Sequence, residues 1–112
     1  AINAQINFPS GIFVDLQGNV FIVDSSSHRI RFINSTNGII STIAGTGLAG
    51  FNGDNQTAIN AQINNPNGIF VDLQGNIYFC DYTNHRIRFI NSTNGIISTI
   101  SGTGVAGFDN DN

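Results

Sequence analysis

The chain has 112 residues and a formal net charge of −3, and it lacks Lys, Glu, Met and Trp. This length fits a single compact domain, and a slight negative charge without any basic cluster predicts no nucleic-acid partner and no membrane surface. Because Cys80 is the only cysteine, an intrachain disulfide and a cysteine-rich metal site are excluded. Several strong helix formers are missing while Ile, Phe, Gly and Asn are frequent, so the composition predicts an all-β fold.

A repeat with an offset of 57 residues dominates the sequence. The longest unchanged segment spans residues 28–43 and returns at 85–100, reading HRIRFINSTNGIISTI both times. Of the 55 positions that align, 42 are identical and thirteen differ. We therefore divide the chain into a first repeat, residues 1–57 with its connecting loop, and a second repeat, residues 58–112.

Each repeat contains four short apolar segments separated by turn residues. Their apolar residues run almost without interruption, which indicates strands that are covered on both faces of the sheet. The connections are short and rich in Asn, Gly and Ser, so consecutive strands should pair antiparallel as a four-stranded meander. In the second repeat, the predicted strands span residues 68–72, 76–81, 86–91 and 96–100.

The motifs of the second repeat resemble the NHL repeat, which forms one blade of a β-propeller. Residues 66–90 read PNGIFVDLQGNIYFCDYTNHRIRFI and contain P-x-G-I-x-V-D, G-N-I-Y-x-x-D and the N-H-R-I sequence that names the family. Residues 95–108 then carry G-T-G-x-A-G-F, which is similar to the loop of the long-loop type of this repeat. The first repeat departs from the motif at Ser27, where the second has Asn84, but a serine can still accept a local backbone bond.

The resemblance implies two propeller blades in which residues 68–72 lie innermost and residues 96–100 outermost, and it implies a ring of about six blades. Two blades alone would leave apolar sheet faces in water, so we expect the chain to assemble with copies of itself. A homotrimer that forms a six-bladed ring is the favoured assembly, because head-to-tail contacts close into a ring when the rotation fits. A dimer and a tetramer are the alternatives, and the interface between chains should copy the interface within a chain.

Each repeat places an aspartate four residues before a histidine, across the loop after the second predicted strand. Such a pair can orient an imidazole for base catalysis or metal binding. Because the pair recurs in each blade, we interpret Asp24 with His28, and Asp81 with His85, as hydrogen-bonded pairs that fix the loop. Arginines that alternate with apolar residues along the third strand are expected to pair with aspartates across blades: Arg29, Arg31, Arg86 and Arg88.

Other residues offer candidate ion or thiol chemistry. Asp15 and Asp72 end the innermost strand and could attract a cation to the axis, but capping of the turn that follows is the favoured role. Residues 50–55 and 107–112 place Asp and Asn beside Gly but lack the spacing and the closing Glu of a calcium loop, so no metal or other cofactor is predicted. Cys80 aligns with a valine of the first repeat, which predicts a small buried core residue.

The differences between the repeats concentrate on the second predicted strand and the loop after it. Scaffold positions are shared by all blades whereas a specific binding site is usually asymmetric, so these differences indicate a candidate binding rim. In the implied topology this loop lies on the same rim as the connector between blades, beside Phe8 and Ser10. The candidate binding rim comprises Ser25, Ser26, Ser27, Asn65, Asn67, Tyr82, Thr83 and Asn84.

The sequence favours a module that catalyses no reaction. We expect a non-enzymatic propeller segment, engineered or excised, that self-assembles into a closed ring and serves as a scaffold or as a binding platform for a protein or peptide. The alternative is a fragment of a propeller enzyme, since NHL-like propellers include lyases and lactonase-like hydrolases that use an axial metal. Such enzymes need an asymmetric cluster of His, Asp or Glu, and the sequence has no pattern of that kind.

Overall fold

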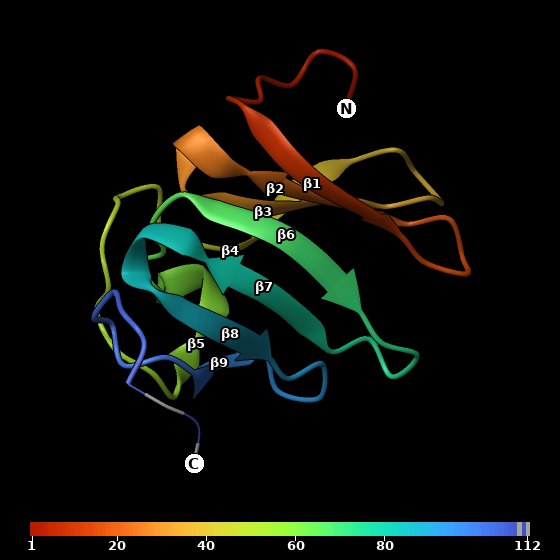
Figure 1. Cartoon of the computed structure of the whole chain (residues 1–112). Coiled ribbons are helices and arrows are strands. Elements are labelled where there is room, and N and C mark those ends of the chain that lie inside the picture. The colour runs from red at the N-terminus through yellow and green to blue at the C-terminus, as the bar shows by residue number, and fades with distance from the viewer. Residues whose placement is uncertain (110, 112) are drawn as a thin grey trace.

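Two antiparallel sheets, one for each repeat, lie side by side in a computed structural model that describes residues 1–109 and 111 (Figure 1). The first sheet has the strand order β1-β2-β3-β4, and the second has the order β5-β9-β8-β7-β6. Both repeats therefore form the predicted all-β meander of a propeller blade. The bounds are β1 (Pro9–Val14), β2 (Val20–Asp24), β3 (Arg29–Ile33), β4 (Ile40–Ala44), β5 (Gln56–Thr57), β6 (Pro66–Val71), β7 (Ile77–Asp81), β8 (Arg86–Ile90) and β9 (Ile96–Ser101).

The second sheet contains a fifth strand that the sequence pattern does not predict. In β5, Gln56 pairs with Ile97 and Thr57 pairs with Ile96 of β9. The N–H of Asn55 extends this ladder by donating to the carbonyl of Ile97 over 2.8 Å. Residues 56 and 57, which the sequence analysis placed in the loop of the first repeat, thus join the second sheet, because they satisfy backbone groups along the open edge of β9.

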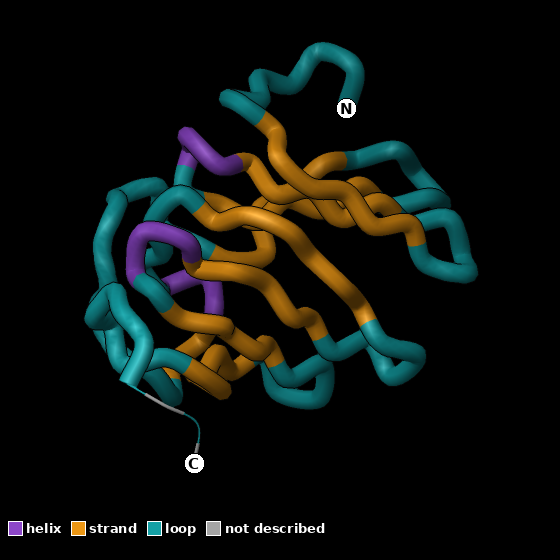
Figure 2. The backbone as a smooth tube through the Cα atoms, in the orientation of Figure 1, coloured by secondary structure: helices purple, strands orange, loops and turns teal. Residues whose placement is uncertain are grey.

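The two ends of the sheets are built differently. Tight hairpin turns gather at one end, which we call the hairpin end, and short helical turns gather with the long connector at the other, which we call the rim end (Figure 2). His28 and His85 follow two of the helical turns, each with a φ of 53° in the left-handed region. No helix in the described part of the chain is long and apolar enough to cross a membrane. The helical turns are η1 (Ser25–Ser27), η2 (Ala58–Asn60) and η3 (Tyr82–Asn84).

The hydrophobic core lies between the two sheets, at an interface that we call the seam. Ile30 of β3 is fully buried there, as are Ala61 and Ile63 of the connector. The innermost strands β1 and β6 approach so closely that a Cβ atom on Gly11 would lie 3.3 Å from the Cα atom of Gly68. A side chain at Gly11 would crowd Gly68, so Gly11 allows the close approach of the strands near the axis, whereas Gly68 has room for a Cβ atom but a φ of 61° that favours glycine.

The seam covers one face of each sheet and leaves the opposite face open. Ile30 of the first sheet is fully buried, whereas its equivalent in the second repeat, Ile87, is 36% exposed. Ile63 of the second repeat is fully buried, whereas its equivalent in the first repeat, Ile6, is 39% exposed. We call the first surface the front face (Val23, Ile30 and Ala44, equivalent to Cys80, Ile87 and Ser101) and the second the back face (Ile63, Pro66 and Val71, equivalent to Ile6, Pro9 and Val14).

Cys80 belongs to the front face that the chain leaves open. The sequence analysis predicted a buried core residue at this position, and in the single chain that prediction is wrong, because Cys80 is exposed. Its equivalent Val23 is fully buried in the seam. The two positions differ in burial because the second sheet packs on the front face of the first, whereas no sheet formed by residues 1–109 and 111 packs on the front face of the second.

Candidate functional site

A pocket at the rim end collects most of the candidate binding rim. Its volume is about 290 Å³ and it lies between the two repeats. Five of the eight predicted rim residues line it, and they are joined by Phe8 and Ser10. The lining residues are Phe8, Ser10, Ser25, Ser26, Asn65, Asn67 and Tyr82, and all of them are uncharged.

The other three predicted rim residues lie outside the lining of this pocket and hold its surroundings. The side chain of Asn84 donates to the Asp81 carboxylate over 2.9 Å and to the carbonyl of Gly50 over 2.8 Å, so it anchors the connector to η3. Thr83 accepts a bond of 3.3 Å from the Asn65 amide at the edge of the pocket. Ser27 contributes its carbonyl to the guanidinium of an arginine in β3. Their roles in the single chain are therefore structural.

Small side chains keep the rim pocket open on the side of the first repeat. The Ser25 hydroxyl donates to the carbonyl of Pro66 over 2.6 Å, so it bonds across the seam, and it is also hydrogen bonded to Ser10. The aromatic rings that flank the pocket are exposed: Tyr82 is 66% exposed and Phe8 is 74% exposed. Serines and asparagines offer donors and acceptors, and two rings offer apolar area, so the pocket suits an uncharged polar segment such as a peptide backbone.

Phe8 holds an unusual backbone conformation at the edge of this pocket. Its φ is 59°, and the equivalent residue Asn65 has a φ of 47°. Asparagine tolerates the left-handed region well, whereas a bulky residue there is an outlier that costs of order 1–3 kcal/mol. The first repeat therefore carries local strain to present an exposed aromatic ring at the rim.

The predicted Asp–His pairs do not form among the described residues. The same aspartates pair with arginines instead. The Asp81 carboxylate bonds to the Arg88 guanidinium over 2.8 Å, and both side chains are fully buried. His28 instead accepts a bond of 3.1 Å at Nδ1 from the backbone N–H of Asn65, which lies across the seam. The aspartate pairs with the arginine because strand alternation places both side chains on the same face of the sheet. The histidine adopts the left-handed conformation and turns away from the aspartate.

The segment 50–55, considered above as a calcium loop, instead contacts two arginines of the second repeat. The Asp54 carboxylate bonds to Arg88 over 3.0 Å and accepts the Thr99 hydroxyl over 2.9 Å. The Phe51 ring lies under Arg86, with the guanidinium carbon 3.8 Å from the ring centroid. No group of three or more His, Cys, Asp or Glu residues within 1–109 and 111 is arranged to hold a metal. Asn110 and Asn112 of the second such segment, 107–112, lie outside the described residues.

Asp15 and Asp72 cap the hairpin turns, as the sequence analysis favoured. The Asp72 carboxylate accepts the backbone N–H of Gln74 over 3.0 Å and that of Asn76 over 2.9 Å, and Asp15 does the same in the first repeat. Partial burial by itself would raise the pKa of Asp72, but the hydrogen bonds, led by those from Asn76, lower it below its ordinary value. The two carboxylates are thus held ionised by their own turns.

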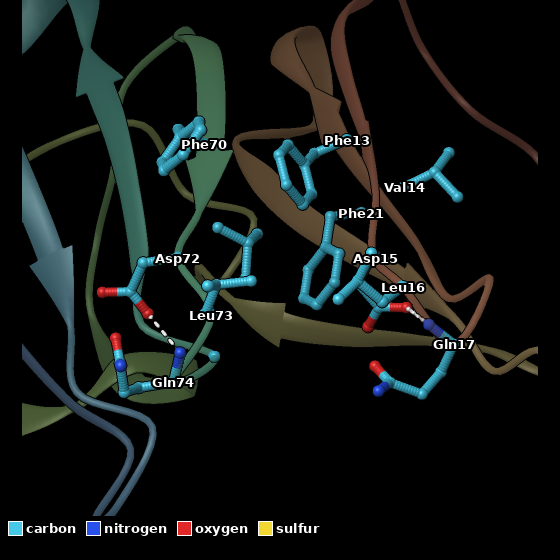
Figure 3. Close-up of a pocket in the computed structure, with 12 residues that line it drawn as sticks. Phe13, Val14, Asp15, Leu16, Gln17, Phe21, Phe70, Asp72, Leu73 and Gln74 are labelled. Atoms are coloured by element: carbon cyan, nitrogen blue, oxygen red, sulfur yellow. Dashed lines mark hydrogen bonds between the residues drawn. The ribbon is translucent and has the colours of Figure 1, made fainter.

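A second and more apolar pocket opens at the hairpin end, and the sequence analysis missed it. Figure 3 shows Phe13 and Phe70 on opposite walls, with Leu16 and Leu73 below them. Its volume is about 480 Å³. The signal that marks it in the sequence is the leucine between the capping aspartate and the glycine of each hairpin turn, because a turn normally exposes a polar residue there.

The chain resembles characterised proteins in sequence. The family model described as "Teneurin NHL domain" matches residues 49–107, which is more than half of the chain. Human teneurin-4 is 41% identical over 100 residues, covering 79% of this chain and 4% of that protein. NHL repeat-containing protein 2 of Bos taurus is 30% identical over 91 residues, covering 80% of this chain and 12% of that protein. The chain therefore spans only a small part of the length of these relatives.

Solved structures agree with the sequence matches at the level of the fold. A Bacteroides thetaiotaomicron protein of unknown function superposes with a TM-score of 0.72 at 23% identity, over 85% of this chain and 24% of that one. A virginiamycin B lyase from Staphylococcus aureus superposes with a TM-score of 0.61 at 20% identity, over 87% of this chain and 28% of that one. Together with the two meander sheets and the NHL motifs, these matches establish that the chain belongs to the teneurin NHL domain family of NHL-repeat β-propellers.

Proposed function

We propose that this chain is a non-enzymatic propeller module that assembles with copies of itself, front face to back face, into a closed ring with a binding rim. The observation that carries the proposal is the unequal burial of equivalent residues. Ile87 is exposed where Ile30 is buried, and Ile6 is exposed where Ile63 is buried. Each open face is thus nearly a copy of a face that the seam already covers, and apolar area removed from water stabilises association.

The seam also supplies a template for polar contacts between chains. Within the chain, the N–H of Gly45 donates to the carbonyl of Ala58 over 3.0 Å, and the N–H of Thr46 donates to that of Ala61 over 3.1 Å. The offset of 57 assigns the same two bonds to Gly102 and Thr103 of one chain and to Ala1 and Ala4 of the next. The position equivalent to Gly11 is also a glycine, Gly68, so the same close approach of strands is sterically open between Gly68 of one chain and Gly11 of the next.

A ring of three chains is the proposed stoichiometry. Front-to-back contacts are heterologous, and such contacts close into a ring when the rotation per subunit divides the circle. Three chains of two blades each give about six blades, a common size for propellers. The rim pocket then recurs once within every chain, and we propose that this rim binds an uncharged stretch of peptide through its serines, asparagines and aromatic rings.

The non-enzymatic part of the proposal is supported by the way the reactive side chains are used. His28 accepts a backbone bond across the seam, and Asp24 and Asp81 neutralise arginines in the blade. These groups are therefore committed to structure. Lyase or hydrolase activity of the assembled chain, assayed with and without added divalent metal, would contradict this part of the proposal.

The experiment that tests assembly is the mass in solution by light scattering at micromolar concentration. We expect roughly three times the chain mass of 12.0 kDa. The matched control is Ile87→Glu, which places a charge on the open front face and should yield a folded monomer, because a buried unpaired carboxylate is costly. A wild-type chain that remains a folded monomer would refute the proposal, and a stable assembly of Ile87→Glu would refute the assigned face.

A further inference from the structure

The connector clasps the second repeat through one aromatic ring and one carboxylate. The Phe51 ring lies 3.8 Å from the guanidinium carbon of Arg86 and 5.0 Å from that of Arg88. Asp54 bonds to Arg88 over 3.0 Å, and Arg88 is fully buried as a result of these contacts and its bond to Asp81. We call this arrangement the clasp.

The arginines of the first repeat are only partly covered. Arg29 donates to the backbone carbonyls of Ser27 and Thr46, and Arg31 bonds to Asp24 over 3.2 Å. The Arg31 side chain keeps 17% of its surface exposed, whereas the equivalent Arg88 side chain is fully buried. Within the described residues, both cation–π contacts belong to the second repeat, so the first repeat presents two arginines without the ring of a clasp.

The C-terminal segment, residues 107–112, contains a ring and a carboxylate equivalent to those of the clasp. The offset of 57 makes Phe108 the equivalent of Phe51, and Asp111 the equivalent of Asp54. Phe108 is 81% exposed, so most of the side chain remains in water in the single chain. The part of the chain just before residue 110 lies beside the second sheet, on the side of the molecule away from the N-terminus (Figure 1).

We propose that the C-terminal segment of one chain clasps the first repeat of another chain, with Phe108 over Arg29 and Arg31 and with Asp111 paired to Arg31. This inference rests on the proposed front-to-back assembly and goes beyond it, because it assigns residues outside the sheet faces to the contact. The partner is a second copy of this chain, since the pattern of two alternating arginines beside an aspartate is the one that the clasp already recognises within the chain.

The differences between the two segments fit this role. Asn52 Oδ1 accepts the backbone N–H of Gln62 over 2.8 Å, and its equivalent Asp109 offers a carboxylate oxygen that can accept the same bond from Gln5 of another chain. The Asn52 amide also donates to the carbonyl of Asn60 over 3.1 Å, and this second bond has no counterpart at Asp109, because a carboxylate has no hydrogen to donate. Asp109 and Asp111 also give the segment two negative charges, opposite the two positive charges of Arg29 and Arg31. Such complementarity speeds encounter and makes association weaken as salt is added.

The test is the association of Phe108→Ala, followed by light scattering over a dilution series. We expect association to weaken about tenfold, because the variant loses a buried ring and two cation–π contacts, while the circular dichroism spectrum of the chain stays unchanged. A second variant, Asp111→Asn, should reduce the dependence of association on salt. The matched control is Phe51→Ala, which removes the clasp within the chain and should lower the unfolding temperature even of the monomer.

The outcomes separate this inference from the assembly on which it rests. If the wild-type chain associates and Phe108→Ala associates equally well with the same salt dependence, the clasp between chains is refuted and front-to-back assembly stands. If the wild-type chain never associates, both fail together. A weaker association of Phe108→Ala with an unchanged fold supports the clasp.

Discussion

Replacing Asp81 with alanine is expected to lower the free energy of unfolding by about 3–5 kcal/mol, because it leaves the buried Arg88 guanidinium without its closest counter-ion. Asp81 also accepts the backbone N–H of Asn64 over 2.8 Å, which loses its acceptor, and the Asn84 amide over 2.9 Å, which keeps only its bond to the carbonyl of Gly50. Urea unfolding followed by circular dichroism measures the loss, in a monomeric variant of the chain such as Ile87→Glu.

The first repeat provides the matched control for this substitution. Asp24→Ala removes the equivalent carboxylate, but its partner Arg31 keeps 17% of its side chain exposed, so water can solvate the remaining charge. The expected loss is therefore clearly smaller than for Asp81→Ala. Equal losses at the two positions would contradict the claim that burial of the Arg88 guanidinium makes its counter-ion important.

Replacing Ile63 with alanine is expected to lower the free energy of unfolding by about 2–5 kcal/mol, because Ile63 is fully buried in the seam and its truncation leaves a cavity. Ile63 lies on the connector, and the strands packed around it cannot easily move to fill the cavity. Thermal or urea unfolding at a dilution that keeps the chain monomeric measures the effect without a contribution from assembly.

The equivalent substitution in the first repeat should weaken assembly and leave the stability of the monomer almost unchanged. Ile6 is 39% exposed in the single chain, so Ile6→Ala should change monomer stability by about 0.5 kcal/mol or less. In the proposed ring the same side chain enters the seam between chains, and the variant should assemble more weakly. A loss of monomer stability in Ile6→Ala as large as in Ile63→Ala would show that the back face of the first repeat is already covered.

The order of the four main strands in each sheet was predictable because each of these strands carries its own sequence signal. The apolar runs of the repeats and the Asn- and Gly-rich turns between them specify a meander, and the strands begin and end within two residues of the predicted segments. The turn caps at Asp15 and Asp72 were predictable for the same reason, since they depend on residues two to four positions away.

The features that the sequence did not predict depend on neighbours in space. β5 forms through backbone groups, so Gln56 and Thr57 carry no side-chain pattern that marks a strand. Cys80 was predicted as buried because it aligns with the apolar residue Val23. Val23 is indeed buried, but the sequence pattern does not tell which copy of a face has a neighbouring sheet to cover it. Pairs of arginine with aspartate were expected across blades, whereas Arg31 with Asp24 and Arg88 with Asp81 pair within one blade, because alternation along β3 and β8 places each arginine on the aspartate's side of its own sheet.

The rim was predictable in part. Five of the eight predicted rim residues line one pocket, because the loop after the second strand and the residues near the start of the first strand meet at the rim end, whereas their role in binding stays a prediction. The strain at Phe8 was not predictable, since the left-handed conformation is ordinary for the asparagine at the equivalent position of the second repeat but not for a phenylalanine.

The reactivity of Cys80 tests the central claim most directly, because this thiol lies on the open front face of the single chain. The measurement is the rate at which iodoacetamide alkylates the folded chain over a range of protein concentrations. If chains pack front to back, Cys80 becomes as buried as Val23 is in the seam, and the rate should fall in proportion to the assembled fraction. An alkylation rate that stays constant while light scattering records assembled chains would contradict the account.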